Sequence, residues 1–449
     1  KMTNDFEIAG DNFGAFVRLT SFYDWENEDG TRAFRPLQDV ALDKVGSDSE
    51  ILDAFVYFNI DAGDIPIDLR LGSQVLSWGE SFFIQNGINS INPVDVSKLR
   101  IPGAELKEAL KPVPMASINI GLTENVTFEA FYQFKWKETI IDPRGTYFST
   151  DEVVSRGSDR LYLGFGAVPE DAPFGFVPRA PNVRASDSGQ GGIAVRVLVP
   201  ELNNTEFGFY AIKNHSRAPL VNAFTPTQHI NPDLTGPLTT VFVLGGMPPA
   251  VAAEQATGLW GLASAVQMFG PEAVPPEQLA ILTAPDSQAA LEAAGQFAFF
   301  DAAATARYQV EYPEDINLYG ISFNTDIGST GWTLQGELSY RPNQPLALDD
   351  VETLYAALSA VNPGFAPINS FGNYWNRLGE EIKGYREKDM YQFQMSAIRV
   401  FGPTLGADQL IFIAEAGYTS IPGLSDTTIP FDGPGTFTTA SELATQMGI

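Results

Sequence analysis

The feature that most constrains this chain is an alternation of apolar and polar side chains with a period of two. From Val126 to Trp136 the even-numbered positions are apolar, whereas Thr127, Glu129 and Gln133 on the other parity are polar. Successive side chains of a β-strand point to opposite faces, so this segment has one apolar and one polar face. The same pattern predicts eleven strands, at residues 13–23, 51–61, 67–76, 115–122, 125–136, 191–199, 205–214, 305–326, 330–341, 388–401 and 408–419.

These predicted strands have the length that a transmembrane β-barrel requires. Most have about 9–11 residues or slightly more, which is what a tilted strand needs to cross the hydrocarbon of a bilayer. The chain has no apolar run of roughly 18 residues, so a membrane-spanning helix is excluded. In the segment 305–326 the apolar parity slips after Pro313, which predicts one long strand with a β-bulge.

The connections between the predicted strands alternate between short and long. The short ones are rich in turn residues and lie at 61–66, 123–124, 200–204, 328–329 and 402–407. The long ones lie at 24–50, 77–114, 137–190, 215–304, 342–387 and after 419. Bacterial barrels have short periplasmic turns and long extracellular loops, so the sequence predicts an all-β transmembrane antiparallel β-barrel in the bacterial outer membrane. The alternative is a soluble antiparallel sandwich, which would not require all long connections at one end.

The strand ends and the strand number extend this prediction. Several apolar faces end in aromatic residues that we expect in girdles at the membrane interfaces; these are Trp136, Trp332, Tyr340 and Tyr418. Single-chain bacterial barrels have an even number of strands, so eleven visible strands imply at least twelve in the closed barrel, and we expect 14 or more. Residues 444–449 lack the terminal aromatic of an outer-membrane strand, which predicts that the chain is incomplete at its carboxyl end.

Charge and residue usage exclude several classes of function. The chain has 55 acidic and 27 basic side chains and a formal charge of −28, so it lacks the basic face that nucleic acid requires. It has no cysteine and therefore no disulfide framework or thiolate metal site. The only histidines, His215 and His229, lie at the edge of or within a long connection, and no phosphate-binding or hydrolase motif is present. We expect no enzyme activity, no metal and no cofactor.

Several runs of residues, most of all between positions 75 and 108, carry a resemblance to a known family. They are Val75-Leu76-Ser77-Trp78-Gly79-Glu80, Gln85-Asn86-Gly87-Ile88-Asn89, Asn92-Pro93-Val94-Asp95, Pro102-Gly103-Ala104-Glu105-Leu106-Lys107-Glu108, Asp142-Pro143-Arg144-Gly145-Thr146-Tyr147-Phe148, Glu387-Lys388-Asp389-Met390 and Gly406-Ala407-Asp408-Gln409. Over nearly its whole length the chain resembles a family of proteobacterial outer-membrane proteins known mainly as a domain of unknown function.

This resemblance implies traffic of hydrophobic compounds or lipids through the outer membrane. Such proteins are usually encoded near a periplasmic lipid-carrier-like protein and an inner-membrane exporter of the resistance-nodulation-division type. The partners that we expect are therefore outer-membrane lipid and lipopolysaccharide, a periplasmic carrier protein and a hydrophobic small molecule. The resemblance supplies no catalytic residues.

The connection 77–114 is the main candidate for a functional site. A barrel of twelve or more strands encloses a lumen that wall side chains alone do not fill, and rings of charged side chains set selectivity in pores. A loop folded inward would place both charge signs at a constriction, whereas the alternative is a lid packed on the barrel rim. The candidate residues are Trp78, Glu80, Gln85, Asn86, Asn89, Asn92, Asp95, Lys98, Arg100, Glu105 and Lys107.

The segment 215–304 is predicted to form an acidic helical insert. Between Arg217 and Arg307 there is no Lys or Arg, whereas seven Asp and Glu occur. The segment is also rich in Ala, Leu, Glu and Gln, which favour helix. Helices are predicted at residues 249–270 and 276–304, with a further short one at 351–361. The insert is either a cap or plug over the barrel mouth, with apolar faces toward a hydrophobic substrate, or a hairpin that packs on other loops.

Charged residues on the polar parity of the strands predict the wall of the lumen. An Arg or Lys that faces lipid at mid-membrane costs roughly 2–4 kcal/mol, so these side chains should face inward. The candidates are Arg18, Asp53, Arg70, Glu129, Lys135, Arg196, Arg307 and Glu337.

Two functions from different classes fit these patterns. The first is an outer-membrane channel for the passage of hydrophobic or amphipathic small molecules or lipids, gated by the connection 77–114 and the insert. The second is a scaffold or docking barrel of a lipid-export assembly. A general porin is a third, weaker hypothesis, because the insert is too apolar for a water-filled mouth.

Overall fold

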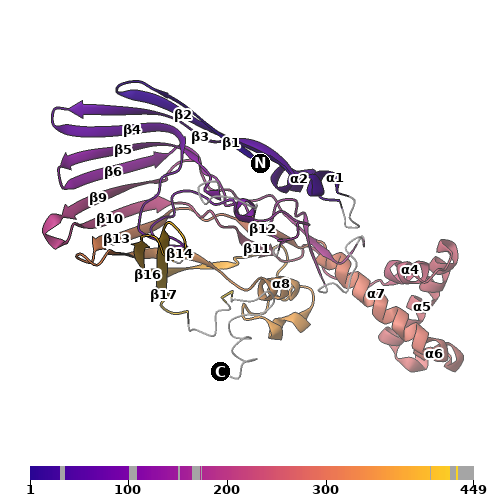
Figure 1. The fold of residues 1–449 in the computed structure, drawn as a ribbon. Coiled ribbons are helices and arrows are strands. Elements are labelled where there is room, and N and C mark those ends of the chain that lie inside the picture. Colours follow the sequence, from indigo (N-terminus) through magenta and orange to yellow (C-terminus); the bar gives the residue numbers. More distant parts are fainter. Residues whose placement is uncertain are drawn as a thin grey trace.

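A large antiparallel sheet dominates the computed structural model, which describes residues 1–30, 36–100, 109–149, 152–163, 172, 174–404, 406–424 and 431–432. Its strands, in spatial order, are β1 (Met2–Ala9), β2 (Phe13–Tyr23), β3 (Ser47–Ala62), β4 (Ile65–Gln74), β5 (Val113–Thr123), β6 (Val126–Gln133), β9 (Gly191–Val199), β10 (Thr205–Asn214), β13 (Ile316–Asp326), β14 (Trp332–Ala347), β16 (Tyr385–Phe401) and β17 (Leu410–Ser420). Each strand pairs with the next one in this order, and β1 and β17 are the two edges, so the sheet is not closed (Figure 1).

Ten of the eleven predicted strands belong to this sheet, and β13, from the predicted strand 305–326, is its eleventh member. The twelfth member, β1, was not predicted. Asn4 interrupts the apolar parity of β1, which is completed only by pairing with β2. The prediction of one bulged strand at 305–326 was wrong.

Residues 305–326 form two strands in different sheets. Pro313 has no backbone N–H to donate, and Asp315 has a left-handed φ of 63°, so the chain changes direction between them. Only β13 enters the large sheet. The preceding β12 (Arg307–Glu311) pairs with β11 (Leu220–Phe224) in a small sheet that also contains β15 (Glu381–Ile382).

One face of the large sheet is apolar from strand to strand. Opposite residues of paired antiparallel strands share a face, and one such row crosses ten neighbouring strands. It contains Ile60, Ile67, Ile120, Phe128, Val195, Phe209, Ile321, Leu338, Phe393 and Tyr418. Phe209 and Ile321 are each 50% exposed, so nothing in the described structure covers this face. We call it the outer face, and the opposite one, which carries Glu129, Arg196 and Glu337, the inner face.

Short turns and long connections lie at opposite ends of the large sheet, as the sequence predicted (Figure 1). The aromatic prediction was only partly right. Tyr340 and Tyr418 are on the outer face, but Trp136 is not, because β6 ends at Gln133. The Trp136 ring is 4% exposed and packs on Tyr312, with ring centroids 4.8 Å apart.

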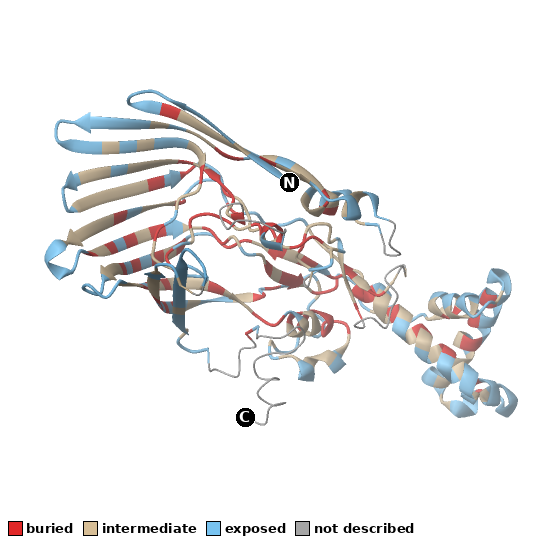
Figure 2. Cartoon of the chain, viewed as in Figure 1, coloured by how far each residue is buried: buried red, intermediate tan, exposed pale blue. Residues whose placement is uncertain are grey.

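The long connections pack on one another beside the end of the sheet. Their regular elements are α1 (Trp25–Asp29), α2 (Asp39–Val45), β7 (Arg160–Tyr162), β8 (Phe176–Pro178), α8 (Asp350–Leu358) and the 3-10 helices Val96–Arg100, Pro271–Ala273 and Pro363–Ile368. A further 3-10 helix, Pro200–Leu202, lies in the short turn between β9 and β10. Figure 2 shows buried residues gathered in these connections and on the adjoining part of the sheet, whereas the short-turn end is mostly exposed or intermediate. Among the described helices, none is long and apolar enough to span a membrane.

The acidic insert forms a helical bundle, which has one more helix than predicted, at 235–244, and two helices within the predicted 276–304. Its helices are α4 (Thr235–Leu244), α5 (Pro249–Phe269), α6 (Pro276–Thr283) and α7 (Pro285–Ala303). Leu238, Leu259 and Ala294 belong to its own small core. Figure 1 shows α7 leading away from the small sheet to α4, α5 and α6, which lie far from the large sheet. The bundle therefore stands beyond the other connections rather than in the space beside the inner face.

Candidate functional site

The connection between β4 and β5 begins with a segment, residues 77–98, that we call the inward segment because it lies against the inner face. Its second residue, Trp78, is fully buried. The indole Nε1 of Trp78 donates a hydrogen bond to Oε2 of Glu129 in β6, at 2.7 Å. Its ring packs edge-on against Phe131 of the same strand, with ring centroids 5.0 Å apart. The segment is thus anchored where it leaves β4.

The carboxylate of Glu337 in β14 holds two points of the inward segment together. Its Oε2 accepts from the backbone N–H of Glu80 at 2.6 Å, and its Oε1 accepts from that of Ile88 at 2.8 Å. A Cβ atom at Gly87 would lie 1.9 Å from Oε1 of Glu337, and one at Gly79 would lie 2.4 Å from Oε2. Glycine at both positions therefore lets the backbone approach the carboxylate, and residues 80–88 form a loop with its ends close together.

Three other wall side chains bind the backbone within this loop. The carboxylate of Glu415 in β17 accepts from the N–H groups of three consecutive residues, Phe82, Phe83 and Ile84, at 2.7–2.9 Å. Gln392 of β16 donates to the carbonyl of Gln85 at 2.7 Å. Arg341 of β14 donates to the carbonyls of Asn86 and Gly87 at 2.7 and 2.6 Å. The wall therefore satisfies backbone groups that an irregular loop cannot pair internally.

Glycines of the inner face make room for the apolar side chains of the inward segment. A Cβ atom at Gly320 of β13 would lie 2.6 Å from Ile88, and one at Gly417 of β17 would lie 2.9 Å from Ile84. At Gly192 of β9 it would lie 3.0 Å from the Trp78 ring. These glycines sit within strands, where glycine lowers stability unless another group approaches closely. These glycines are a signal in the sequence that could have indicated where the loop lies, and the prediction did not use it.

Charges of both signs meet beside Glu80. Arg196 of β9 forms ion pairs with Glu129 at 2.7 Å and with Glu206 at 3.0 Å, and its guanidinium lies 3.8 Å from the Glu80 carboxylate. The predicted residues Glu80, Glu129, Arg196 and Glu337 are therefore brought together on the inner face. The sequence did not indicate that Arg341 and Gln392 bind the backbone of the loop.

The remaining candidate residues of the connection 77–114 serve its packing or lie elsewhere. Asn89 donates to Ser77 at 2.9 Å. Asn92 donates to the carbonyls of Gln74 and Lys111 at 3.1 and 3.0 Å. Asp95 accepts from the Ser97 hydroxyl at 2.5 Å.

Lys98 and Arg100 pair with residues of other connections and strands. Lys98 is 3.4 Å from Glu50 and 3.7 Å from Asp48, and Arg100 is 2.9 Å from Asp142. Arg100 is therefore among the packed long connections and not beside Glu80. The other two candidates, Glu105 and Lys107, lie outside the described residues.

Of the predicted wall residues, two are not on the wall. Lys135 follows the end of β6 at Gln133, and Arg307 lies on β12 in the small sheet, with its guanidinium over the Phe224 ring. Both predictions assumed strands that end or divide earlier than the apolar pattern indicates.

The other predicted wall residues are on strands of the large sheet. Arg18 of β2 pairs with Asp5 at 2.7 Å and with Asp53 at 3.5 Å. The Arg70 guanidinium of β4 lies 5.5 Å from the centre of the Phe55 ring. These groups pair with other wall side chains and solvate the part of the inner face near β1.

An aromatic pocket lies among the long connections, in the half of the chain that contains β2 and α1. It has a volume of about 650 Å³. Its lining includes Phe22, Tyr23, Trp25, Tyr147 and Phe148, together with the basic side chains of Lys44 and Arg100. Several of these rings are exposed, with Trp25 at 74% and Tyr147 at 93%.

Comparison with protein families gives the affiliation of the chain. The family described as "Protein of unknown function (DUF1302)" matches residues 1–447. The chain belongs to this family. The family resemblance expected from the sequence is thereby confirmed, although the association with carrier proteins and exporters remains a prediction. Among curated proteins, none matches this DUF1302 chain.

Solved structures similar to this DUF1302 chain include outer-membrane channels. The outer membrane channel DcaP of Acinetobacter baumannii is 9% identical, with 93% of this chain and 66% of that chain covered and a TM-score of 0.32. A porin is 9% identical, with 93% of this chain and 91% of the porin chain covered and a TM-score of 0.22. Pseudomonas aeruginosa OpdL is 8% identical, with 94% of this chain and 91% of the OpdL chain covered and a TM-score of 0.21. The chain thus spans 66% of the DcaP chain.

The construction of its own sheet makes this DUF1302 chain an outer-membrane β-protein. Its strands have the length that crosses hydrocarbon, and long connections gather at one end. The exposed face is apolar across ten strands, whereas the face that binds the inward segment is polar and charged, which is the distribution of a transmembrane β-wall. The predicted fold class, an antiparallel outer-membrane β-protein, and the predicted location in the outer membrane are therefore confirmed. The sheet of the described residues is not closed.

Proposed function

We propose that this chain forms a solute channel of the outer membrane and that the inward segment narrows the passage. The observation that carries the proposal is the hydrogen bonding of residues 80–88 to Glu337, Glu415, Arg341 and Gln392. These groups hold the loop against the inner face at the level of the strands, where a solute that crosses between them must pass. A lid on the rim would instead bond to the ends of strands.

A channel requires a closed wall, and the proposal includes this closure. In the described residues, β1 and β17 each present one unpaired side. Unpaired backbone groups cannot be satisfied by lipid. We therefore propose that further pairing at both edges completes the wall in the membrane.

The proposed solutes are hydrophobic or amphipathic small molecules. The inward segment displays two phenyl rings, Phe82 and Phe83, that are 38% and 66% exposed. The aromatic pocket defined above offers a second apolar surface among the long connections. Apolar surface of this kind favours removal of a hydrophobic solute from water, whereas charged side chains alone would favour ions.

The experiment is to shorten the loop between its two fixed points. Because Glu80 and Ile88 both bind the Glu337 carboxylate, residues 81–87 can be replaced by two glycines while both anchors remain. We expect a higher single-channel conductance in planar bilayers, because the narrowing is removed and the wall is kept.

A matched control replaces residues 235–283, the α4 to α6 part of the bundle, by a short Gly-Ser linker. Because this part lies away from the large sheet, the control should leave the conductance unchanged. Unchanged conductance of the 81–87 variant, together with lowered heat resistance, would show that the loop only packs the wall, and the proposal would fail.

A further inference from the structure

A small cavity among the long connections is lined almost entirely by basic side chains. It has a volume of about 230 Å³. The residues around it are Lys44, Lys111, Lys137, Glu138, Ile140, Arg156 and Arg184. Five of the 27 basic residues of a chain with a formal charge of −28 thus surround one cavity. They come from three different long connections, so the fold gathers them.

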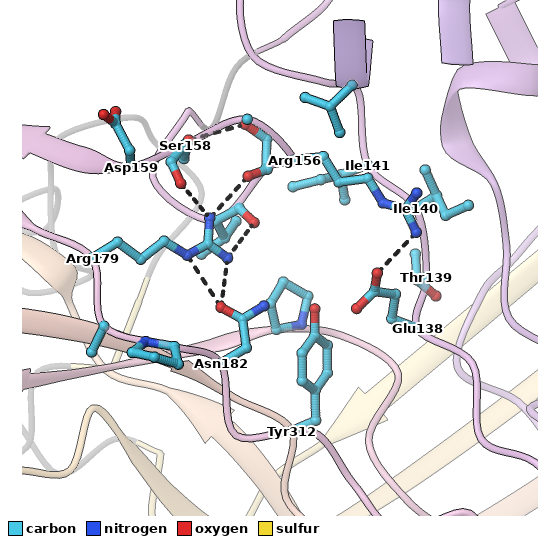
Figure 3. A pocket seen from close by; sticks show the side chains of 17 residues that line it. Glu138, Thr139, Ile140, Ile141, Arg156, Ser158, Asp159, Arg179, Asn182 and Tyr312 are labelled. Carbon is cyan, nitrogen blue, oxygen red and sulfur yellow. Dashed lines mark hydrogen bonds and ion pairs between the residues drawn. The ribbon is translucent and has the colours of Figure 1, made fainter. Parts of the chain in front are cut away.

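Three of these cations have carboxylate partners. Lys44 is 3.0 Å from Asp48, and Lys111 forms an ion pair with Glu50. The Arg156 guanidinium donates to Glu138 at 2.9 Å, and both residues also line a second pocket, which Figure 3 shows. Lys98 also pairs with Asp48 and Glu50. Four cations therefore share three carboxylates.

The other two cations of the lining have no carboxylate within ion-pair distance among the described residues. The Lys137 ammonium donates to the carbonyl of Pro112 at 2.7 Å. The Arg184 guanidinium lies over the Trp136 ring, 5.3 Å from its centre. Burial lowers the pKa of Lys137, and the neighbouring charge of Lys111 adds to this effect. An anion in the cavity would offset both the lost hydration and the repulsion.

The basic cavity adjoins the aromatic pocket, because Lys44 lines both. The smaller space, about 230 Å³, suits a carboxylate or similar head group, and the larger one, about 650 Å³, suits an apolar body. Ligand pockets usually combine such apolar surface with a few well-placed polar groups. The two spaces together match a molecule with an anionic end and an apolar end.

We infer that the basic cavity is a binding site for the carboxylate of an amphipathic solute whose apolar part occupies the aromatic pocket. The inference rests on the proposed function for the role of this binding in passage. The binding itself is measured at equilibrium, without transport, so that failure of the channel proposal and failure of this inference give different results.

The test is calorimetric titration of the full chain in nanodiscs with three probes. They are 4-phenylbutyrate, 4-phenyl-1-butanol and inorganic phosphate. We expect 4-phenylbutyrate to bind about tenfold more tightly than either other probe, since a charge-assisted hydrogen bond contributes about this factor. The preference over the alcohol should shrink as salt is added, because salt screens the basic side chains.

Two variants locate the site. Arg184→Met and Lys137→Met should each weaken 4-phenylbutyrate binding about tenfold and leave the alcohol unaffected. Arg160→Met is the matched control, because Arg160 lies in the same connection but pairs with Asp159 and does not line the cavity. Equal affinity for the acid and the alcohol, equal affinity for the acid and phosphate, or unchanged binding in both variants would each overturn the inference.

Discussion

Glu337 couples the wall and the inward segment through one carboxylate. It is 2% exposed, and its two oxygens accept from backbone N–H groups of Glu80 and Ile88. A buried N–H group without an acceptor is costly, so the position of the loop depends on this side chain. Arg341, four residues further along β14, completes the attachment from the same strand.

At this scale we predict that Glu337→Gln destabilises the folded protein by about 1–3 kcal/mol. The amide keeps one acceptor oxygen, but its NH2 group cannot accept from the second N–H, which is left unpaired. The free energy of unfolding in urea, measured in detergent micelles, checks this. Ser339→Ala is the control, since the buried Ser339 hydroxyl of the same strand has no hydrogen-bond partner within the part of the chain that the structure describes. Similar losses in both variants would contradict the assigned role of Glu337.

Parity distinguishes the two faces of each strand in the large sheet, but parity alone does not show which positions tolerate a substitution. Gln133 has the polar parity in β6, yet it is 1% exposed. Its amide donates to the carbonyl of Ile91, and its oxygen accepts from Arg217. Inner-face positions therefore divide into those covered by the inward segment and those open to the lumen, such as Asn119 of β5, which is exposed.

For the strand β5 we predict that a substitution by arginine has unequal effects on stability at two neighbouring positions. Ile118 is on the outer face, paired with Leu69 and Ala130. Ile118→Arg should lower the free energy of unfolding in lipid vesicles by roughly 2–4 kcal/mol if it is near the midplane. Asn119→Arg should change it by less than about 1 kcal/mol, because its charge faces water. Equal costs at both positions would mean that the two faces are not lipid and lumen.

At the scale of the whole molecule, the long connections and the helical bundle share one end of the sheet (Figure 1). The short turns occupy the other end. In bacterial barrels the long loops are extracellular and the short turns periplasmic. In this orientation the basic cavity and the aromatic pocket would lie on the extracellular side of the membrane.

The absence of cysteine makes this orientation directly testable. Single cysteines are introduced at Gln278 in α6 and at Glu124 in the turn between β5 and β6, both of which are exposed. We predict that a membrane-impermeant maleimide labels Gln278→Cys on intact cells and labels Glu124→Cys only after the outer membrane is opened. Labelling of the turn alone on intact cells would reverse the orientation.

The sequence by itself determined the strands, the turns and the helical bundle, because these depend on local periodicity. Alternation over about ten residues fixes which side chains face lipid, and turn residues mark the ends of strands. The positions of Glu129, Arg196 and Glu337 on the inner face followed from the same rule, whereas that of Glu80 depended on the separate hypothesis that the connection 77–114 folds inward. Where the local pattern was weak or misleading, as in β1 and at Pro313, the prediction failed.

Only the tertiary structure decided how the inward segment is held and where the basic residues gather. Glu80 and Glu337 are 257 positions apart, and Ile84 and Glu415 are 331 apart. Such pairs depend on the register of every intervening strand, and a shift of one residue would turn each wall side chain to the other face. Likewise, Lys44, Lys111 and Arg184 belong to separate connections whose periodicity carries no information on their contacts. Their shared cavity exists because the sheet brings the ends of β3, β5 and β9 to the same side.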